Sequence, residues 1–156
     1  MAALELSDRA LARCISALVN GQGAEHPALA VPGNESDTVY RAVGIALPSG
    51  ASLTLASLAK ALKIGERTHL EAKPFATFFD VRSDSGFPPA VRADMLRRGE
   101  LVKTIMRATL KRAQIVAART ADATFPNEFE PQVPYFVIGQ SSSGMAIGVR
   151  AVSIET

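Results

Sequence analysis

The stretch YFVIGQSSSGMAIGVRAVSI, residues 135–154, decides how this chain folds. Two apolar runs flank the polar segment QSSSG, and both runs are rich in aromatic and β-branched residues. Such residues favour strands, and a short Ser-Gly segment between two of them is typical of a hairpin. We therefore predict a C-terminal hairpin. The turn has the small residues that can surround a phosphate, but it lacks the lysine and following helix of a phosphate-binding loop.

Two loops interrupted by proline lie upstream of this hairpin. Residues 120–134, TADATFPNEFEPQVP, contain three prolines and no apolar periodicity. Residues 22–35, QGAEHPALAVPGNE, form a second such loop, which is long for a compact domain and so indicates function or flexibility. If the protein were a small enzyme with its site in this second loop, Glu25, His26 or Glu35 would have to line the pocket.

The segment from Pro89 to Arg119 predicts the longest helix. Pro88 and Pro89 suit a helix start, and Gly99 is expected to kink or split the helix. Apolar residues recur at helical spacing along the rest of the segment. These residues are Val102, Ile105, Met106, Thr109, Leu110, Ala113, Val116 and Ala117.

Two further helices are predicted nearer the N-terminus. Residues 6–20 place Cys14 in an apolar stripe, where a small buried side chain is expected. Residues 52–64 form the second helix, with Gly65 as its C-terminal cap. Residues 36–47 fit either a helix capped by Ser36 or Asp37 or an alternating strand, and the cap and the alanines favour the helix.

The fold class follows from these elements. Residues 75–81, FATFFDV, are rich in aromatic residues, and this composition predicts a strand. We predict an α+β fold in which three to four helices pack on a small antiparallel sheet. The sheet would contain residues 75–81, 134–139 and 145–154, and the whole of 1–156 would form a single globular domain.

Composition excludes several classes of protein. Apolar residues make up 47% of the 156 residues and charged residues 21%, as in ordinary globular domains. Cys14 is the only cysteine, so no internal disulfide or multi-cysteine metal site can form. No apolar run reaches the roughly 18 residues that span a bilayer, and the acidic start of the chain does not resemble an export signal. We expect a cytoplasmic protein without a membrane partner.

Charge is unevenly distributed along the chain. Residues 92–119 carry a net charge of +6, although the whole chain carries only +2. The basic residues of this segment are Arg92, Arg97, Arg98, Lys103, Arg107, Lys111, Arg112 and Arg119. On a continuous helix, Lys103, Arg107 and Lys111 would form one outward ridge, which could pair with phosphates. The ridge could also be an ordinary solvated face, or it could meet the acidic C-terminal region of a neighbouring copy.

The segment LAKALKIGERTHL, residues 58–70, resembles the core of bacterial helix-turn-helix regulators. Leu58, Ala59, Leu62, Ile64 and Thr68 match the pattern, which would imply a DNA-reading helix after the turn. Lys63 stands where the turn usually has glycine, and Gly65 where it favours serine. Pro74 would end the second helix after about two turns, too short to reach several bases. A helix that leads directly into a strand explains the same residues, and we favour it.

These observations favour a non-catalytic, nucleic-acid-associated protein, with DNA and RNA both open as ligands. The alternative is a structural or assembly subunit of a larger complex, such as a phage particle or a secretion machine, that docks or self-associates through its charge-segregated surfaces. No catalytic constellation, cofactor site or metal site is predicted. The candidate nucleic-acid-binding residues are Lys103, Arg107, Lys111, Arg112, Lys60, Lys63, Arg67 and His69.

Overall fold

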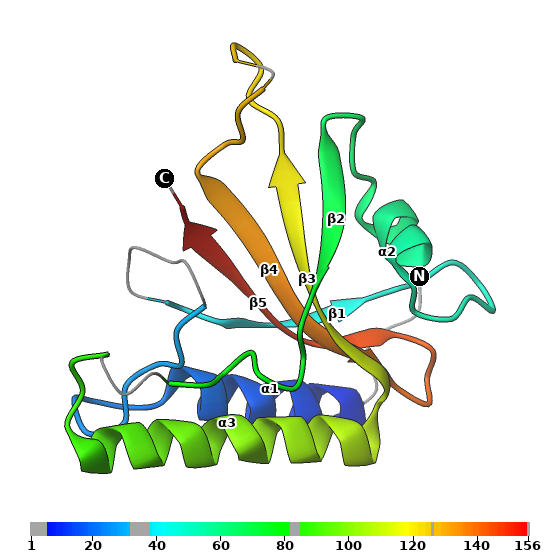
Figure 1. Ribbon diagram of the computed structural model, residues 1–156. Coiled ribbons are helices and arrows are strands. Elements are labelled where there is room, and N and C mark those ends of the chain that lie inside the picture. The colour runs from blue at the N-terminus through cyan, green and yellow to red at the C-terminus, as the bar shows by residue number, and fades with distance from the viewer. Residues whose placement is uncertain (1–5, 32–37, 82–84, 126, 156) are drawn as a thin grey trace.

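The computed structural model describes residues 6–31, 38–81, 85–125 and 127–155. Three helices and one five-stranded antiparallel sheet make up these residues, so the predicted α+β class with a C-terminal hairpin is confirmed (Figure 1). The helices are α1 (Leu6–Asn20), α2 (Leu55–Leu62) and α3 (Pro89–Thr109). The strands are β1 (Arg41–Ile45), β2 (Thr68–Lys73), β3 (Lys111–Thr120), β4 (Gln132–Gln140) and β5 (Ala146–Ile154).

The predicted hairpin forms the middle of the sheet. The strand order is β1-β5-β4-β3-β2, and every neighbouring pair is antiparallel. The β4–β5 ladder runs from Gln132 opposite Ile154 to Gln140 opposite Ala146. Because strand side chains alternate between faces, Val137 points to one side of the sheet and Ile138 to the other. Both are fully buried, so both faces of this hairpin are covered.

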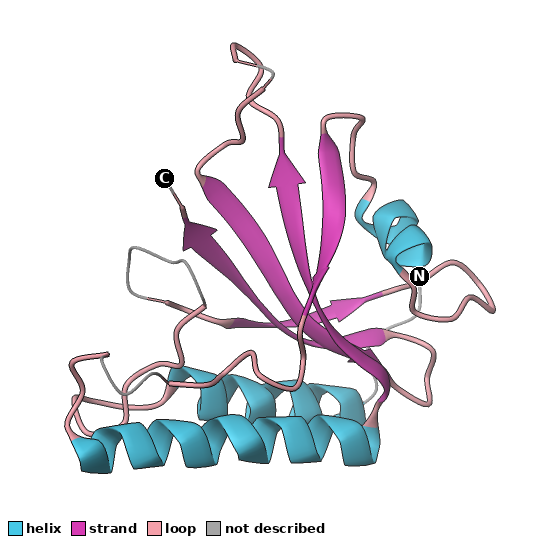
Figure 2. Ribbon diagram, viewed as in Figure 1, coloured by secondary structure: helices cyan, strands magenta, loops and turns pink. Residues whose placement is uncertain are grey.

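Helices cover the two faces of the sheet unequally. α1 and α3 lie side by side under one face, as Figure 2 shows, and they enclose the larger core with Ile15, Met106 and Ile115. α2 covers part of the other face, where Leu58 packs on Phe136 and its neighbours. The upper part of the sheet extends beyond the α1–α3 layer (Figure 1).

The predicted helix from Pro89 to Arg119 is wrong in its last third. α3 ends at Thr109, and β3 begins at Lys111 and runs to Thr120. Residues 115–118 are all buried, because β3 lies inside the sheet and is covered on both sides. A strand buried on both faces has a continuous apolar run, which periodicity alone cannot distinguish from a buried helix. Gly99 does not split α3, which is a single helix.

Two other segments also differ from prediction. Residues 75–81 form no strand; the strand is β2, which ends just before Pro74. The aromatic residues after Pro74 belong to the core instead, since Phe78 and Phe79 are 5% and 3% exposed. Of the two readings for residues 36–47, the alternating strand describes β1, while the proposed caps at 36 and 37 lie outside the described residues.

The apolar stripe of α1 is turned relative to the prediction. Ala12, Ile15 and Val19 face the core, and Cys14 is exposed. The C-terminal end of α1 is fixed to the start of the sheet by Asn20, whose side chain accepts from the Tyr40 backbone N–H at 2.8 Å and donates to the Tyr40 carbonyl at 2.9 Å. This pairing sets the position of β1 at one edge of the sheet.

Candidate functional site

Lys103, the centre of the predicted basic ridge, is buried. Its side chain is 1% exposed, and Nζ donates to the Ala76 carbonyl at 2.6 Å. Glu100 and Asp80 lie 3.2 and 3.6 Å from the same nitrogen. A long cation can lie inside the molecule only because these oxygens replace its water. The prediction that Lys103 points outward is therefore wrong, and no continuous ridge exists along α3.

Three of the predicted cations gather where α3 meets β3. Arg107 lies in the last turn of α3, while Lys111 and Arg112 open β3, and all three are exposed. The Arg107 guanidinium lies over the Phe75 ring, 5.2 Å from its centroid. Arg112 has φ of +56°, beside the irregularity in the β3–β4 register, which directs the chain around this corner. We call Arg107, Lys111 and Arg112 the basic corner.

The other four candidate cations lie around α2 and β2. Lys60 and Lys63 are exposed on α2, and Arg67 and His69 lie at and within the start of β2. Because α2 ends at Leu62 and β2 follows, the helix-turn-helix interpretation is wrong and the helix-to-strand connection is confirmed. Lys63, not Gly65, takes the left-handed cap position, with φ of +53°. The eight predicted residues therefore do not form one surface.

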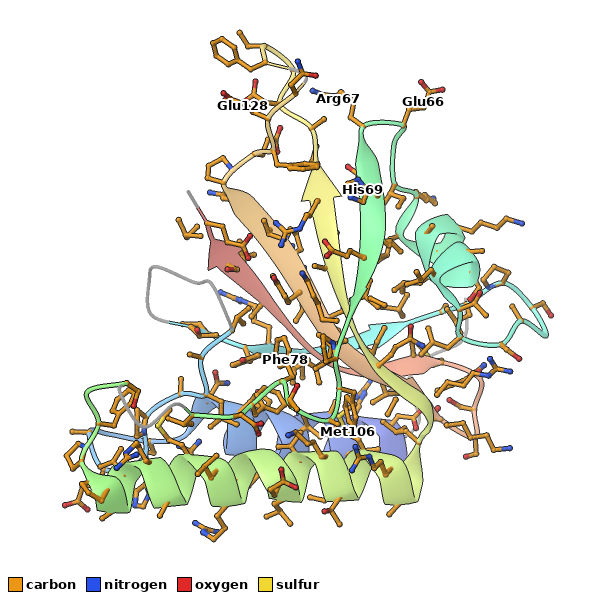
Figure 3. All side chains as sticks on the ribbon, in the orientation of Figure 1. Glu66, Arg67, His69, Phe78, Met106 and Glu128 are labelled. Atoms are coloured by element: carbon orange, nitrogen blue, oxygen red, sulfur yellow. The ribbon has the colours of Figure 1, made fainter. Side chains whose placement is uncertain are left out.

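The most prominent surface feature was not predicted as a site. The connection between β3 and β4, of which residues 121–125 and 127–131 are described, projects beyond the ends of all the strands, and we call it the projecting loop (Figures 1 and 3). Figure 3 places Glu128 on this loop, and Glu66 and Arg67 on the neighbouring turn that leads into β2. One sequence signal could have identified the projecting loop: two phenylalanines stand among prolines and acidic residues.

Hydrogen bonds give the projecting loop a definite shape. The Asp122 carboxylate accepts from the backbone N–H groups of Thr124 and Phe125, at 2.7 and 3.0 Å. At the base, the Glu130 backbone N–H donates to the Thr120 carbonyl at 2.8 Å. The loop is also tied to the β2 side, since the Ala121 N–H donates to the Arg67 carbonyl at 2.8 Å. These bonds fix the backbone at the start and the base of the loop.

The projecting loop exposes two large aromatic side chains. Phe125 is 59% exposed and Phe129 is 51% exposed. Phe129 packs edge-on against His69, with ring centroids 5.5 Å apart, so this ring has a fixed orientation. The charged residues of the loop are all acidic, namely Asp122, Glu128 and Glu130. Exposed aromatic side chains on an ordered, protruding segment are typical of protein-binding surfaces.

A polar network lies below the projecting loop, on the part of the sheet that the α1–α3 layer leaves open. Arg119 of β3 donates to Glu71 at 2.8 Å and to Glu155 at 2.7 Å. The Tyr135 hydroxyl donates to the other oxygen of Glu155 at 3.0 Å, and Lys73 donates to Glu71 at 2.9 Å. Arg119 and Glu155 line a cavity of about 450 Å³ together with Glu128, Phe129, Glu130 and Pro131.

The charges of this network are matched to one another. Hydrogen bonds from Lys73 and Arg119 lower the pKa of Glu71. Burial alone would raise the pKa of Glu155, but the bonds from Arg119 and Tyr135 outweigh it and lower that pKa. Burial and the bond to Glu155 raise the pKa of Tyr135 to about 12. Near neutral pH, Glu71 and Glu155 therefore stay ionised and the Tyr135 hydroxyl keeps its proton. The hydrogen bonds between these groups then persist and support the base of the loop.

A second ionic cluster joins α3 to α1 and to the loop after α1. Asp94 accepts from Arg98 at 2.8 Å and from Arg97 at 2.8 Å, and His26 Nδ1 lies 3.0 Å from it. Arg98 also donates to the carbonyls of Leu18 and Pro27. Among the described residues, no hydroxyl or thiol hydrogen-bonds to His26, so this His-Asp pair carries no nucleophile. Its contacts serve to connect three segments.

The small-residue turn of the C-terminal hairpin also binds a carboxylate. Asp8 of α1 is 4% exposed, and it accepts from the hydroxyls of Ser141 and Ser143 at 3.3 and 2.7 Å. These hydroxyls are the donors that a phosphate would need. The turn therefore anchors the start of α1, and the negative charge of Asp8 opposes a bound phosphate.

Within the parts of the chain that the structure describes, no three His, Cys, Asp or Glu side chains gather as metal ligands, and no helix is both long and apolar enough to cross a bilayer. No protein-family model matches the sequence, and no curated protein shows significant similarity to it.

Proposed function

We propose that this protein is a non-catalytic assembly subunit that docks another protein through its projecting loop. The observation that carries the proposal is the exposure of Phe125 and Phe129 on a loop whose backbone is fixed by hydrogen bonds. The cytoplasm is the compartment we propose, since the lone thiol of Cys14 is exposed and a reducing environment preserves such a group.

The two rings could contribute to docking but would need further contacts. Because Phe125 and Phe129 are only about half exposed, burying the rest would contribute roughly 2–3 kcal/mol, whereas association costs about 4–15 kcal/mol in lost freedom. The fixed loop reduces the ordering part of that cost. The acidic residues beside the rings would supply the complementary charge that steers a partner and fixes its orientation. A basic partner surface with an apolar patch fits both features.

Photo-crosslinking tests the proposal directly. p-Benzoylphenylalanine is placed at position 125, and the protein is irradiated both purified and in an extract of the cells that make it. The matched control carries the same group at position 87, where Phe87 is 37% exposed on the segment before α3. We expect position 125, and not position 87, to give a protein adduct that mass spectrometry identifies. Adducts with nucleic acid alone, or equal labelling from both positions, would overturn the proposal.

A second candidate function is binding of nucleic acid through the basic corner. It is favoured by one observation: Arg107, Lys111 and Arg112 are exposed and, among the described residues, form no ion pair with an acidic side chain. Phosphates would pair with them and release counterions. A gel shift that weakens steeply with salt and disappears in the R107E/K111E/R112E variant would support this function. The variant leaves Lys103 unchanged because that residue is buried.

A further inference from the structure

The projecting loop and the basic corner carry opposite charges. Residues 121–131 contain three acidic residues and no lysine or arginine, while residues 101–121 contain no acidic residue at all. Many other charges of the protein are already paired: Arg119 with Glu155, Arg98 with Asp94, and Lys103 with Glu100. Glu128 and Glu130 form no ion pair among the described residues, and neither do the side chains of the basic corner.

The two surfaces cannot meet within one molecule. Lys111 begins β3 and Thr120 ends it, directly before the projecting loop. At about 3.3 Å per residue, a strand of this length separates its ends by roughly 30 Å. β3 is paired with β2 from Ile115 to Thr120 and with β4 on its other side, so its two ends stay apart. Their complementarity can be satisfied only between molecules.

The basic corner also offers an aromatic surface for the rings of the loop. Phe75 is only partly buried, and Arg107 lies over its ring at 5.2 Å. An exposed ring such as Phe125 can pack against this Arg-Phe pair, because guanidinium groups stack on aromatic faces. At the same time, Glu128 and Glu130 would approach Lys111 and Arg112.

We propose that the partner of the projecting loop is the basic corner of a second copy of this chain. The inference rests on the proposed docking function and names its partner. Two copies could exchange both contacts reciprocally in a two-fold dimer, or each copy could use its loop on one neighbour and its corner on another, which makes the contact heterologous. Repeated contacts of this kind form a closed ring or an open filament, according to the rotation between copies.

Sedimentation velocity at low salt, over a range of concentrations, tests this association. We expect the wild-type protein to grow in mass with concentration and to dissociate as salt is added. Two variants each remove one half of the contact: R107E/K111E/R112E reverses the corner, and E128K/E130K reverses the loop. Each alone should associate roughly tenfold more weakly or worse. Circular dichroism confirms that both remain folded.

The 1:1 mixture of the two variants is the decisive sample. The corner variant retains a native loop and the loop variant a native corner, so the mixture should associate through this native contact. The two reversed surfaces are again opposite in charge and do not oppose association. A wild-type protein that stays monomeric, a variant that still associates alone, or a mixture that fails to pair overturns the inference. If the crosslink from position 125 then identifies a different protein, the proposed docking function is supported, whereas the inference that a second copy is the partner is wrong. Association that requires added nucleic acid overturns the inference as well.

Discussion

Lys103 lies inside the protein with its ammonium group between a backbone carbonyl and two carboxylates. The carboxylates of Asp80 and Glu100 are largely exposed, so water supports the acidic side of the cluster. The Ala76 carbonyl belongs to the irregular segment after β2, and Lys103 belongs to α3. Lys103 therefore adds a polar contact between this segment and α3, beside the burial of Phe78 and Phe79 in the core.

Replacing Lys103 should lower the free energy of unfolding, and the loss should depend on which polar groups are left buried without a partner. Lys103→Met keeps most of the side-chain volume but leaves the Ala76 carbonyl without its donor, which should cost about 1–3 kcal/mol. Lys103→Glu places a carboxylate beside three oxygen acceptors and should cost about 3–5 kcal/mol or more. Arg107→Glu, on the exposed end of the same helix, should change stability by less than about 1 kcal/mol. Urea unfolding followed by circular dichroism measures all three, and equal losses would contradict this account.

Lys63 adopts a backbone conformation that suits glycine better. It caps α2 with φ of +53° and ψ of +44°, the left-handed region. Lys63→Gly should therefore raise the free energy of unfolding by about 0.5–1 kcal/mol. Lys60→Gly, inside α2, is the matched control and should lower it by about 1 kcal/mol. Both variants lose one lysine, so thermal shifts of the same sign would indicate a charge effect and refute the conformational explanation.

At the level of elements, the sequence predicts helices and exposed turns better than it predicts the sheet. The C-terminal hairpin was predictable because its two apolar runs and its Ser-Gly turn are local signals. β3 was not, because residues 115–118 are buried from both sides and lose the alternation that marks a half-buried strand. Phe78 and Phe79 were wrongly assigned to a strand. These aromatic residues are buried in the core, but the segment that carries them is irregular.

The candidate site was predictable only in part. The excess of basic residues between Arg92 and Arg119 is plain from the sequence. Which of these side chains are buried, paired or exposed depends on where α3 ends. Arg119 pairs with Glu71, which is distant in the sequence, so that pairing required the β2–β3 register. The exposure of Phe125 is likewise a tertiary property, since the residue type alone predicts burial.

Gly99 is required by the packing of α3. A Cβ at this position would lie 2.8 Å from the Phe79 Cβ, closer than carbon atoms can approach. Although alanine favours helices by about 1 kcal/mol over glycine, Gly99→Ala should lower the free energy of unfolding by about 1–3 kcal/mol through this overlap. Gly65→Ala meets no atom within 4 Å and serves as the control. Chemical denaturation should separate the two variants, and a stabilised Gly99→Ala protein would contradict the packing model.

At the scale of the whole molecule, two ionic clusters join segments that are distant in the sequence. Asp94 connects α3 through Arg98 to α1 and the following loop, and Glu155 connects the end of the chain through Arg119 to β3. All of the carboxylates concerned are stabilised in their charged form. The folded protein should therefore lose stability in acid, as these groups take up protons.

Asp94 provides the clearest test of this acid dependence. Burial alone would raise its pKa, but hydrogen bonds from Arg98, His26 and Arg97 lower that pKa from 3.8 to about 2. The lowered pKa stabilises the folded state above about pH 4, and this contribution is lost as the pH falls toward 2. Asp94→Asn should be less stable than wild type at pH 6, with the difference shrinking toward pH 2. Urea unfolding at stepped pH measures the difference, which would stay constant if Asp94 did not titrate in this range.

The single thiol of Cys14 is a native site for a spin label, and distances between such labels would report the symmetry of an oligomer. This thiol lies exposed on α1, and no other cysteine competes for a label. A nitroxide attached there would report label-to-label separations by pulsed dipolar spectroscopy without any engineered residue. A two-fold dimer would give one separation, whereas a polar array would add a longer one between next-nearest copies. The native chain can thus distinguish a closed pair from a growing array.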